Sequence, residues 1–300
     1  MKKLLIIVGP TASGKTEFAI GCAKLLNSEV ISADSMQIYK TMNIGTAKAA
    51  PDEMCGIKHH MLDIAAADRE YSVAEYKEAA TSVIENLFLQ NRTPVICGGT
   101  GLYINAVIYP LNFSDTEKNS HLRNALLAEL NGNGPEYMHE KLRLLDEKSA
   151  EKIHFNDTKR LIRALEINLT CGKRVDLELQ KPVYDYLMIG FSPSSRDALY
   201  NRINARVDKM FEAGLADEVR QLLSDGLTFD AQSMQAIGYK EFKDYFDGKI
   251  DETQLKELIK RHTRNYAKRQ LTWFKKYPDA VWFERPCKEA YALVKNTFIR

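Results

Sequence analysis

The sequence predicts an α/β protein built on a parallel sheet covered by helices, with a helical insertion domain. Three observations support this fold class. Short apolar runs of strand length alternate with helical patterns along much of the chain, which is typical of a parallel sheet buried on both faces. A glycine-rich loop separates the first apolar run from the first helical pattern, and one internal stretch has helical patterns without any strand pattern.

The first element is the apolar run 4–8, which leads directly into the sequence Gly-Pro-Thr-Ala-Ser-Gly-Lys-Thr at 9–16. This is a complete G-x-x-x-x-G-K-[ST] loop, and a helical pattern over 17–26 follows it. Strand, glycine loop and helix form the context that this phosphate-binding motif requires. We therefore expect the sheet to be P-loop NTPase-like.

The chemistry of this loop is narrow. Its two glycines allow the backbone to turn so that several N–H groups point into one hollow, and the following helix adds its positive N-terminal end. Lys15 adds a positive charge, and the Thr16 hydroxyl is placed to bind Mg²⁺. Such a hollow binds a diphosphate or a triphosphate. The loop alone specifies neither which of the two it binds nor what attacks it.

The remaining elements continue the alternation. An amphipathic pattern predicts a helix at 73–89, and the last hundred residues are mostly helical. The apolar runs that predict the later strands are 30–31, 94–97, 186–191 and 281–283.

The stretch 112–155 differs from the rest of the chain. It is polar over 114–120, then helical, then broken at 131–135 by the sequence Asn-Gly-Asn-Gly-Pro, and then helical again. We interpret it as a helical insertion, so that the P-loop core comprises 1–111 and 156–300.

The composition is that of an ordinary globular protein, with 45% apolar and 27% charged residues. The net charge is only +2, so a nucleic-acid partner would have to bind a local basic patch. No apolar run approaches the length of a membrane span. Met1-Lys2-Lys3 resembles the start of a signal peptide, but the apolar run after it is too short for one. We therefore expect a cytoplasmic protein.

The cysteines and the paired histidines do not indicate a metal centre. Adjacent His59 and His60 point in different directions and have no third ligand at a useful spacing, so we expect them to form hydrogen bonds. The cysteines form no C-x-x-C pair, and we interpret them as reduced thiols rather than as zinc ligands or disulfides. They are Cys22, Cys55, Cys97, Cys171 and Cys287.

Polar residues follow the second and third expected strands. The second strand ends at Asp34, and because adjacent parallel strands share one crevice at their carboxyl ends, we expect Asp34 to face the phosphate loop. Three roles are open for it: a general base, a carboxylate that holds Mg²⁺ through water, or a cap of a turn. The third strand ends in Gly-Gly-Thr-Gly at 98–101, which suits either a tight turn or the close approach of a ligand, with the Thr100 hydroxyl meeting a phosphate oxygen.

Basic residues gather in the second half of the chain. The pairs Arg160 with Arg163 and Arg202 with Arg206 each lie on one helical face, where they would bind phosphate oxygens or form solvated salt bridges. The segment 256–276 carries eight basic residues against one acidic residue, with aromatic residues interleaved. This pattern indicates a nucleic-acid surface, and the alternative is an amphipathic helix whose aromatic side packs on the core.

Taken together, these residues resemble the tRNA dimethylallyltransferase (tRNA isopentenyltransferase) family. Eukaryotic members of that family carry a C-terminal zinc finger, which the cysteine spacing here does not indicate, so the chain resembles the bacterial type. The resemblance covers nearly the whole chain in order, through the sequences at 9–16, 34–39, 44–48, 98–103, 156–166, 202–207, 236–241 and 268–273.

The resemblance implies transfer of a dimethylallyl group from dimethylallyl diphosphate to N6 of the adenosine 3′-adjacent to the anticodon in tRNA. Diphosphate is released, and Mg²⁺ is the cofactor, held by Thr16. Asp34 would accept the proton of N6, while Arg206 and Thr100 would meet the departing diphosphate. Whether Arg206 or Arg202 does so depends on the phase of their helix. We expect a monomer that binds the anticodon stem-loop.

The resemblance also implies two sets of binding residues. Those for the diphosphate are Gly9, Thr11, Ala12, Ser13, Gly14, Lys15 and Thr16. Those for tRNA are Asp34, Ser35, Met36, Gln37, Thr158, Lys159, Arg160, Leu161, Ile162, Gln235, Ala236, Ile237, Gly238, Tyr239, Lys240, Lys268, Arg269, Gln270, Trp273 and Lys275.

Three other functions compete with this interpretation. An adenylate isopentenyltransferase would act on free nucleotide and would need no large basic surface. A small-molecule kinase would use the same loop for ATP. A non-catalytic RNA-binding module would leave the intact Lys15 and Asp34 unexplained.

Overall fold

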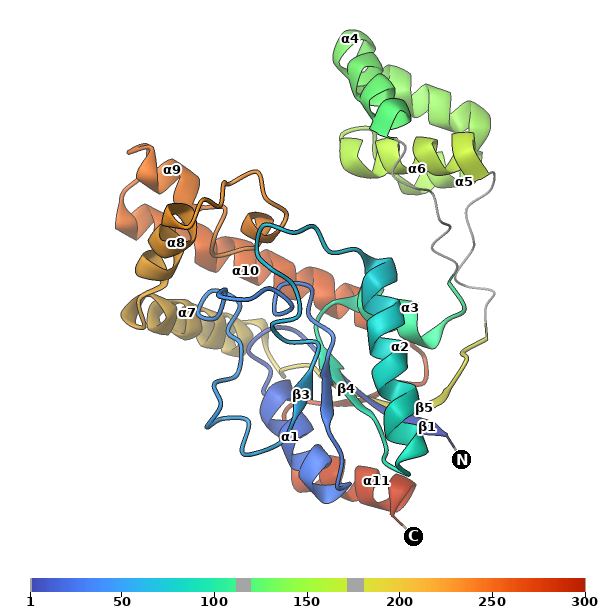
Figure 1. Ribbon diagram of the computed structural model, residues 1–300, viewed down its shortest axis with the longest axis vertical. Helices are drawn as coiled ribbons and strands as arrows, with labels where there is room; N and C mark the ends of the chain where they lie inside the picture. Colours follow the sequence, from blue (N-terminus) through green and yellow to red (C-terminus); the bar gives the residue numbers. More distant parts are fainter. Residues whose placement is uncertain (1, 112–119, 172–180, 300) are drawn as a thin grey trace. The chain divides into compact units, whose positions relative to one another are not determined.

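The computed structural model describes residues 2–111, 120–171 and 181–299. The chain divides into two compact units (Figure 1). The first joins Met1–Ile108 with Pro182–Arg300, and the second is Tyr109–Lys181. Among the described residues, no helix is long and apolar enough to cross a membrane.

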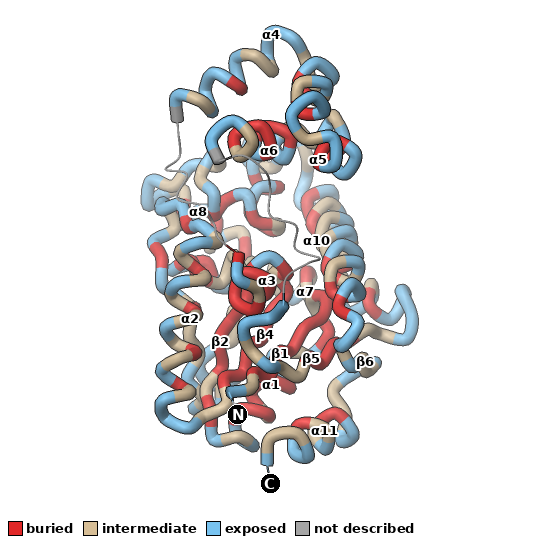
Figure 2. Tube along the Cα trace, turned by 90° about the vertical axis from the view of Figure 1, so that its right-hand side faces the viewer, coloured by how far each residue is buried: buried red, intermediate tan, exposed pale blue. Residues whose placement is uncertain are grey.

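The first unit is built on a six-stranded sheet in the order β3-β2-β4-β1-β5-β6, and every strand pair in it is parallel. Leu5 in the central strand pairs with Val95 on one side and Leu187 on the other. Figure 2 shows the middle of the sheet as the most deeply buried part of this unit. The strands are β1 (Lys3–Val8), β2 (Val30–Ser32), β3 (His59–His60), β4 (Val95–Gly98), β5 (Asp185–Phe191) and β6 (Val281–Phe283).

The expected strands are confirmed to within a residue or two, but the sheet differs from expectation in two respects. The edge strand β3 has only two residues, too few to show a pattern. The strand β2, which precedes Asp34, is not next to the strand that precedes the phosphate loop, because β4 lies between them. After β2 the chain passes outward to β3, and α2 then returns it so that β4 enters the gap beside β1.

Helices cover both faces of this sheet. On one face, Phe18 and Cys22 of α1 and Val294 of α11 pack against β1, β4 and β5. Figure 1 shows α2 and α3 on the opposite side, where Tyr76 and Tyr103 stack with ring centroids 3.7 Å apart. The helices are α1 (Lys15–Leu25), α2 (Val73–Leu89), α3 (Gly101–Ile108), α7 (Arg196–Glu212), α8 (Leu215–Ser224), η2 (Ser233–Gln235), α9 (Phe242–Phe246), α10 (Glu252–Phe274) and α11 (Lys288–Phe298).

Capping boxes set where two long helices of this unit begin. Ser72 forms a capping box with Glu75 at the start of α2. Asp251 forms another with Gln254 at the start of α10. Each box satisfies backbone N–H groups that have no partner within the helix, and it thereby stabilises the first turn.

The second unit is helical, as expected, and consists of α4 (Ser120–Leu145), α5 (Glu147–Lys152) and α6 (Thr158–Cys171). α4 is broken at Gly134, whose φ of 85° confirms the break expected at 131–135. The unit is wider than the expected insertion at 112–155, because Leu161 and Leu165 of α6 join Met138 and Leu142 of α4 in one core. The polar residues 114–119 lie outside the described residues.

The two adjacent histidines form hydrogen bonds, and the described cysteines form no disulfide. His60 Nε2 lies 2.5 Å from Glu29 Oε2, and His59 Nδ1 lies 2.9 Å from the Ile57 carbonyl oxygen, which confirms hydrogen-bonding histidines. The described cysteine side chains are free thiols, and the side chain of Cys171 lies outside the described residues.

Candidate active site

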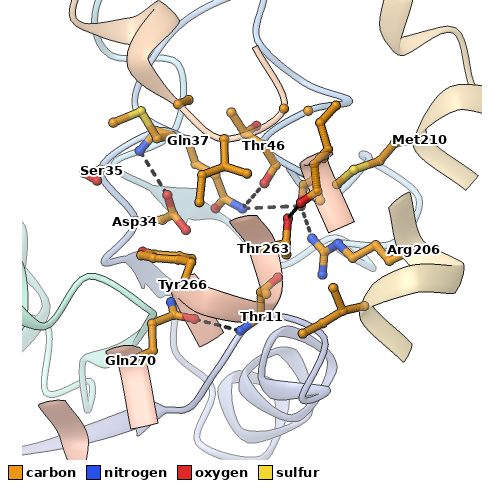
Figure 3. A pocket seen from close by; sticks show the side chains of 18 of the residues that line it. Thr11, Asp34, Ser35, Gln37, Thr46, Arg206, Met210, Thr263, Tyr266 and Gln270 are labelled. Carbon is orange, nitrogen blue, oxygen red and sulfur yellow. Dashed lines mark hydrogen bonds between the residues drawn. The ribbon is translucent and has the colours of Figure 1, made fainter. Parts of the chain in front are cut away.

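The loops that follow β1, β2 and β4 leave the sheet at the same edge, and the first two border a cavity of about 330 Å³ (Figure 3). Helices α7 and α10 and the segment 235–240 complete its walls. The predicted site residues that line the cavity are Thr11, Lys15, Thr16, Asp34, Ser35, Met36, Gln37, Arg206, Gln235, Ala236, Ile237, Gly238, Lys240, Arg269 and Gln270.

The phosphate loop has the backbone geometry that its sequence predicts. Gly14 has a φ of 84°, in the left-handed region that favours glycine. A Cβ atom at Gly9 would come within 2.9 Å of the Phe191 carbonyl oxygen, so this position requires glycine. The Ser13 Oγ is buried without a hydrogen-bond partner. A buried polar group without a partner is costly in free energy. The unpaired Ser13 hydroxyl just before α1 fits a loop that binds an anion.

The positive groups of the cavity are desolvated. Burial lowers the pKa of Lys15. The nearby Cys97 and Asp34 oppose this lowering, and the positive charge of Arg206 adds to it. Burial also lowers the pKa of Arg206, and Asp34 and Glu53 oppose this effect. Burial raises the pKa of Cys97 to about 12, so Cys97 is a neutral thiol at physiological pH. Two cations therefore face one carboxylate, an arrangement that attracts an anionic ligand.

Asp34 has the turn-capping role that its sequence position left open, and its part in the chemistry stays a prediction. Its Oδ1 accepts the backbone N–H of Met36 at 2.9 Å, so it does cap a turn. Asp34 also lines the cavity together with Arg206 (Figure 3) and Lys15. An ionised carboxylate accepts about four hydrogen bonds, so the capping bond leaves capacity for a proton or a metal ion.

Thr100 lies behind the Asp34 turn and is not among the residues that line the cavity. Its Oγ1 accepts the backbone N–H of Ser35 at 3.0 Å, and its own N–H donates to the Ala33 carbonyl oxygen at 3.0 Å. Thr100 therefore holds the turn that presents Asp34. Its contact with a diphosphate stays a prediction.

The phase of α7 places Arg206, and not Arg202, at the cavity. Arg206 lines the cavity, and its Nη2 lies 3.5 Å from the Ala47 carbonyl oxygen, whereas Arg202 is exposed and outside the lining. Sequence reasoning missed other lining residues of α7 and α10. They are Ile203, Val207, Met210, Ile259, Thr263 and Tyr266. Most of them stand three, four or seven positions from Arg206 or Gln270, so helical spacing was the signal that would have found them.

Several of the implied tRNA contacts have other roles in the structure. Gln270 is buried, accepts the Thr11 N–H through Oε1 at 3.0 Å and donates from Nε2 to the Gly99 carbonyl oxygen at 3.0 Å. Its side chain therefore joins two loops and also lines the cavity, so its contact with RNA stays a prediction. The Thr11 N–H is occupied by this bond. Tyr239 is fully buried, so its side chain is closed to RNA.

Two more corrections concern the segment 158–162, which belongs to the second unit. Leu161 and Ile162 are buried in the core of that unit, so their side chains do not reach an RNA surface, whereas Lys159 and Arg160 are exposed. The helix α6 is amphipathic, and these two residues fall on its apolar side.

The basic segment 256–276 forms most of α10, and both interpretations of it hold in part. Phe274 is fully buried, and Trp273 packs so closely on Gly101 that a Cβ atom there would lie 2.1 Å from the indole nitrogen. Lys268, Arg269 and Lys275 are exposed. The Arg269 guanidinium lies 5.6 Å from the centre of the Tyr266 ring at the cavity.

Comparison with known proteins agrees with this geometry. A model of the IPP transferase family matches residues 37–277. The chain belongs to this family. Among similar proteins, the tRNA dimethylallyltransferase of Clostridioides difficile (strain 630) is 45% identical, over 100% of this chain and 97% of its own length. That of Thermoanaerobacter sp. (strain X514) is 44% identical, over 99% and 96%.

Solved structures of the family are similar as well. A tRNA isopentenylpyrophosphate transferase from Bacillus halodurans is 43% identical, with a TM-score of 0.75 over 99% of this chain and 95% of that one. A eukaryotic dimethylallyltransferase acting on tRNA is 28% identical, with a TM-score of 0.84 over 100% of this chain and 80% of that one. The family model starts at Gln37, but these relatives extend the similarity over the phosphate loop and Asp34.

Proposed function

We propose that this chain transfers the dimethylallyl group of dimethylallyl diphosphate to N6 of the adenosine just 3′ of the anticodon in tRNA. The observation that carries the proposal is the cavity in which Lys15, Arg206 and Asp34 meet. It brings together the charges that a leaving diphosphate needs and a carboxylate suited to accept a proton. The family relatives named above support the choice of tRNA as the acceptor.

In the reaction the allylic C–O bond breaks, a C–N6 bond forms, and N6 loses one proton. The exocyclic amine of adenine is a poor nucleophile, so a base that accepts this proton as the bond forms lowers the barrier. Asp34 is that base. Lys15 and Arg206 stabilise the charge that develops on the departing diphosphate, and in a desolvated cavity such stabilisation is stronger than in water.

The residues of the cavity fit a magnesium ion that binds with the diphosphate. Thr16 lines the cavity and would hold the ion through its hydroxyl, and Asp34 lines the same cavity. Mg²⁺ usually takes one or two carboxylates together with substrate phosphate oxygens. In the described parts of the chain, no group of three or more acidic, histidine or cysteine residues forms a metal site by itself, which suits an ion held jointly with substrate. Bound there, Mg²⁺ would neutralise charge on the leaving diphosphate.

The exposed cations of α10, together with Lys275, which directly follows this helix, provide the RNA surface. Lys268 and Lys275 are available to phosphates, and Arg269 stands where the surface meets the cavity. The target adenine has to leave its stack to reach Asp34, as in other enzymes that modify a base. We infer that the protein works in the cytoplasm. We also infer that it is a monomer, which light scattering of the purified chain tests.

The test is a transfer assay with radiolabelled dimethylallyl diphosphate and Mg²⁺. Three acceptors are compared: an anticodon stem-loop RNA with adenosine next to the anticodon, the same RNA with guanosine at that position, and AMP. We expect label on the first RNA alone, and nucleoside mass analysis then locates it on N6. Label on AMP alone supports the adenylate enzyme instead. Turnover of ATP without prenyl transfer would contradict the proposal.

A further inference from the structure

A carboxylate of α8 holds one wall of the cavity by four hydrogen bonds. Glu218 Oε2 accepts the backbone N–H groups of Asn43 and Ile44, each at 2.8 Å. Its Oε1 accepts the backbone N–H of Gly45 at 3.1 Å and the hydroxyl of Tyr239 at 2.6 Å. Glu218 itself is not among the residues that line the cavity.

These bonds depend on the negative charge of Glu218. Three successive backbone N–H groups that converge on one point form a nest for an anion, and here the protein's own carboxylate fills it. A carboxylate offers about four acceptor positions, and four donors use them. A glutamine at this position has one acceptor oxygen and presents an NH₂ group to donors, so it cannot satisfy the same four groups.

The wall continues into the cavity. Gly45, whose N–H Glu218 holds, lines the cavity together with the next two residues, Thr46 and Ala47. The carbonyl oxygens of Thr46 and Ala47 accept the Gln37 amide at 3.2 and 3.3 Å. The Ala47 carbonyl oxygen also lies 3.5 Å from Nη2 of Arg206 (Figure 3). The guanidinium is thus positioned by a backbone segment that Glu218 fixes from the other side.

Tyr239, the fourth partner of Glu218, also packs against the wall. A Cβ atom at Gly45 would come within 2.4 Å of the Tyr239 ring, so ring and backbone are in close contact. Tyr239 is fully buried. The Glu218 carboxylate, the Tyr239 ring and the backbone of residues 43–45 are therefore in mutual contact.

We propose that Glu218 is a positioning residue for prenyl transfer, which fixes the 43–47 wall and through Ala47 sets the place at which Arg206 meets the diphosphate. This inference rests on the proposed function. It makes Glu218 act through Arg206, and not on substrate directly. A displacement of about 1 Å in a positioned group lowers a rate by up to roughly 10²-fold.

The test compares single-turnover prenyl transfer for the wild type, Glu218→Gln, Arg206→Ala and the double variant. We expect Glu218→Gln to lower kcat/KM for dimethylallyl diphosphate by roughly 10- to 100-fold, with affinity for the stem-loop RNA unchanged. In the Arg206→Ala background the same substitution has an effect below about twofold, because the group through which it acts is gone. An equal loss in both backgrounds, or none in either, overturns the inference.

Matched variants separate positioning from general damage. Asp217→Asn changes the neighbouring acid in the same turn of α8, which is exposed and paired with Arg220, and it should leave kcat/KM unchanged. If Glu218→Gln does not fold, Tyr239→Phe takes its place in the cycle, since it removes one of the four bonds and keeps the ring. It should lower kcat/KM several-fold, again only when Arg206 is present. A wild type without transfer activity contradicts the proposed function instead.

Discussion

The amide of Gln270 joins the phosphate loop to the loop after β4, and its removal is predicted to destabilise both. Gln270→Leu leaves the Gly99 carbonyl oxygen and the Thr11 N–H without their partner. A buried group left unsatisfied costs about 1–3 kcal/mol. Gly99 is buried and carries that cost in full, whereas Thr11 is half-buried and water reaches it, so its share is smaller. We therefore expect a loss of about 2–4 kcal/mol in the free energy of unfolding.

The assay is urea unfolding followed by circular dichroism, together with the KM for dimethylallyl diphosphate, which should rise as the phosphate loop loosens. Gln270→Glu sharpens the test, because it keeps an acceptor for Thr11 but sets a carboxylate oxygen against the Gly99 carbonyl oxygen. Asn265→Leu, an exposed position on the same helix, is the control and should change stability by less than about 0.5 kcal/mol. A loss below about 1 kcal/mol in Gln270→Leu with KM unchanged would refute the bridging role.

Three further predictions follow from the sheet, the loop and the basic surface. Gly98→Ala should cost about 1–3 kcal/mol in urea unfolding, because its Cβ would lie 2.1 Å from the Ala33 carbonyl oxygen; unchanged stability contradicts this close contact. Burial lowers the pKa of Lys15, so this side chain loses its charge at a lower pH than an ordinary lysine does. Titration calorimetry should therefore show that the affinity for diphosphate falls as the pH rises, and that the fall begins below the ordinary range of lysine. The Lys15→Arg variant stays charged, so its affinity for diphosphate should not fall in this way. If the wild type and the variant have the same affinity at every pH, Lys15 is not the group that titrates. Lys268→Ala and Arg269→Ala should each weaken binding of the stem-loop RNA and reduce the slope of log affinity against log salt by about 1, and an unchanged slope removes the residue from the RNA surface.

Contiguous sequence motifs were enough to predict the parts of the site that depend on local geometry. The loop at 9–16 specified its own backbone, because glycine is required at 9 and 14 for steric reasons that the structure shows. Asp34 was found because it follows a buried strand, and parallel strands end at one edge. Arg206 was found by its spacing from Arg202, although only the fold could say which of the two faces inward.

The features that sequence reasoning missed depend on packing between distant parts of the chain. The position of β4 between β1 and β2 follows from how the chain returns through α2. The hydrogen bonds of Gln270 were missed, because they join α10 to residues more than 170 positions away. Leu161 was carried over from a motif, and its burial depends on α4. No local pattern contains these contacts.

The central claim is that one cavity unites the phosphate loop with a carboxylate that takes the proton of the acceptor amine. The most direct test is the single-turnover rate of dimethylallyl transfer by Asp34→Asn, because asparagine keeps the shape and one acceptor oxygen for the Met36 N–H but can no longer take a proton. We predict a rate roughly 10²- to 10⁴-fold below the wild type, with RNA affinity unchanged. An undiminished rate, or a loss that saturating RNA restores, would contradict the account.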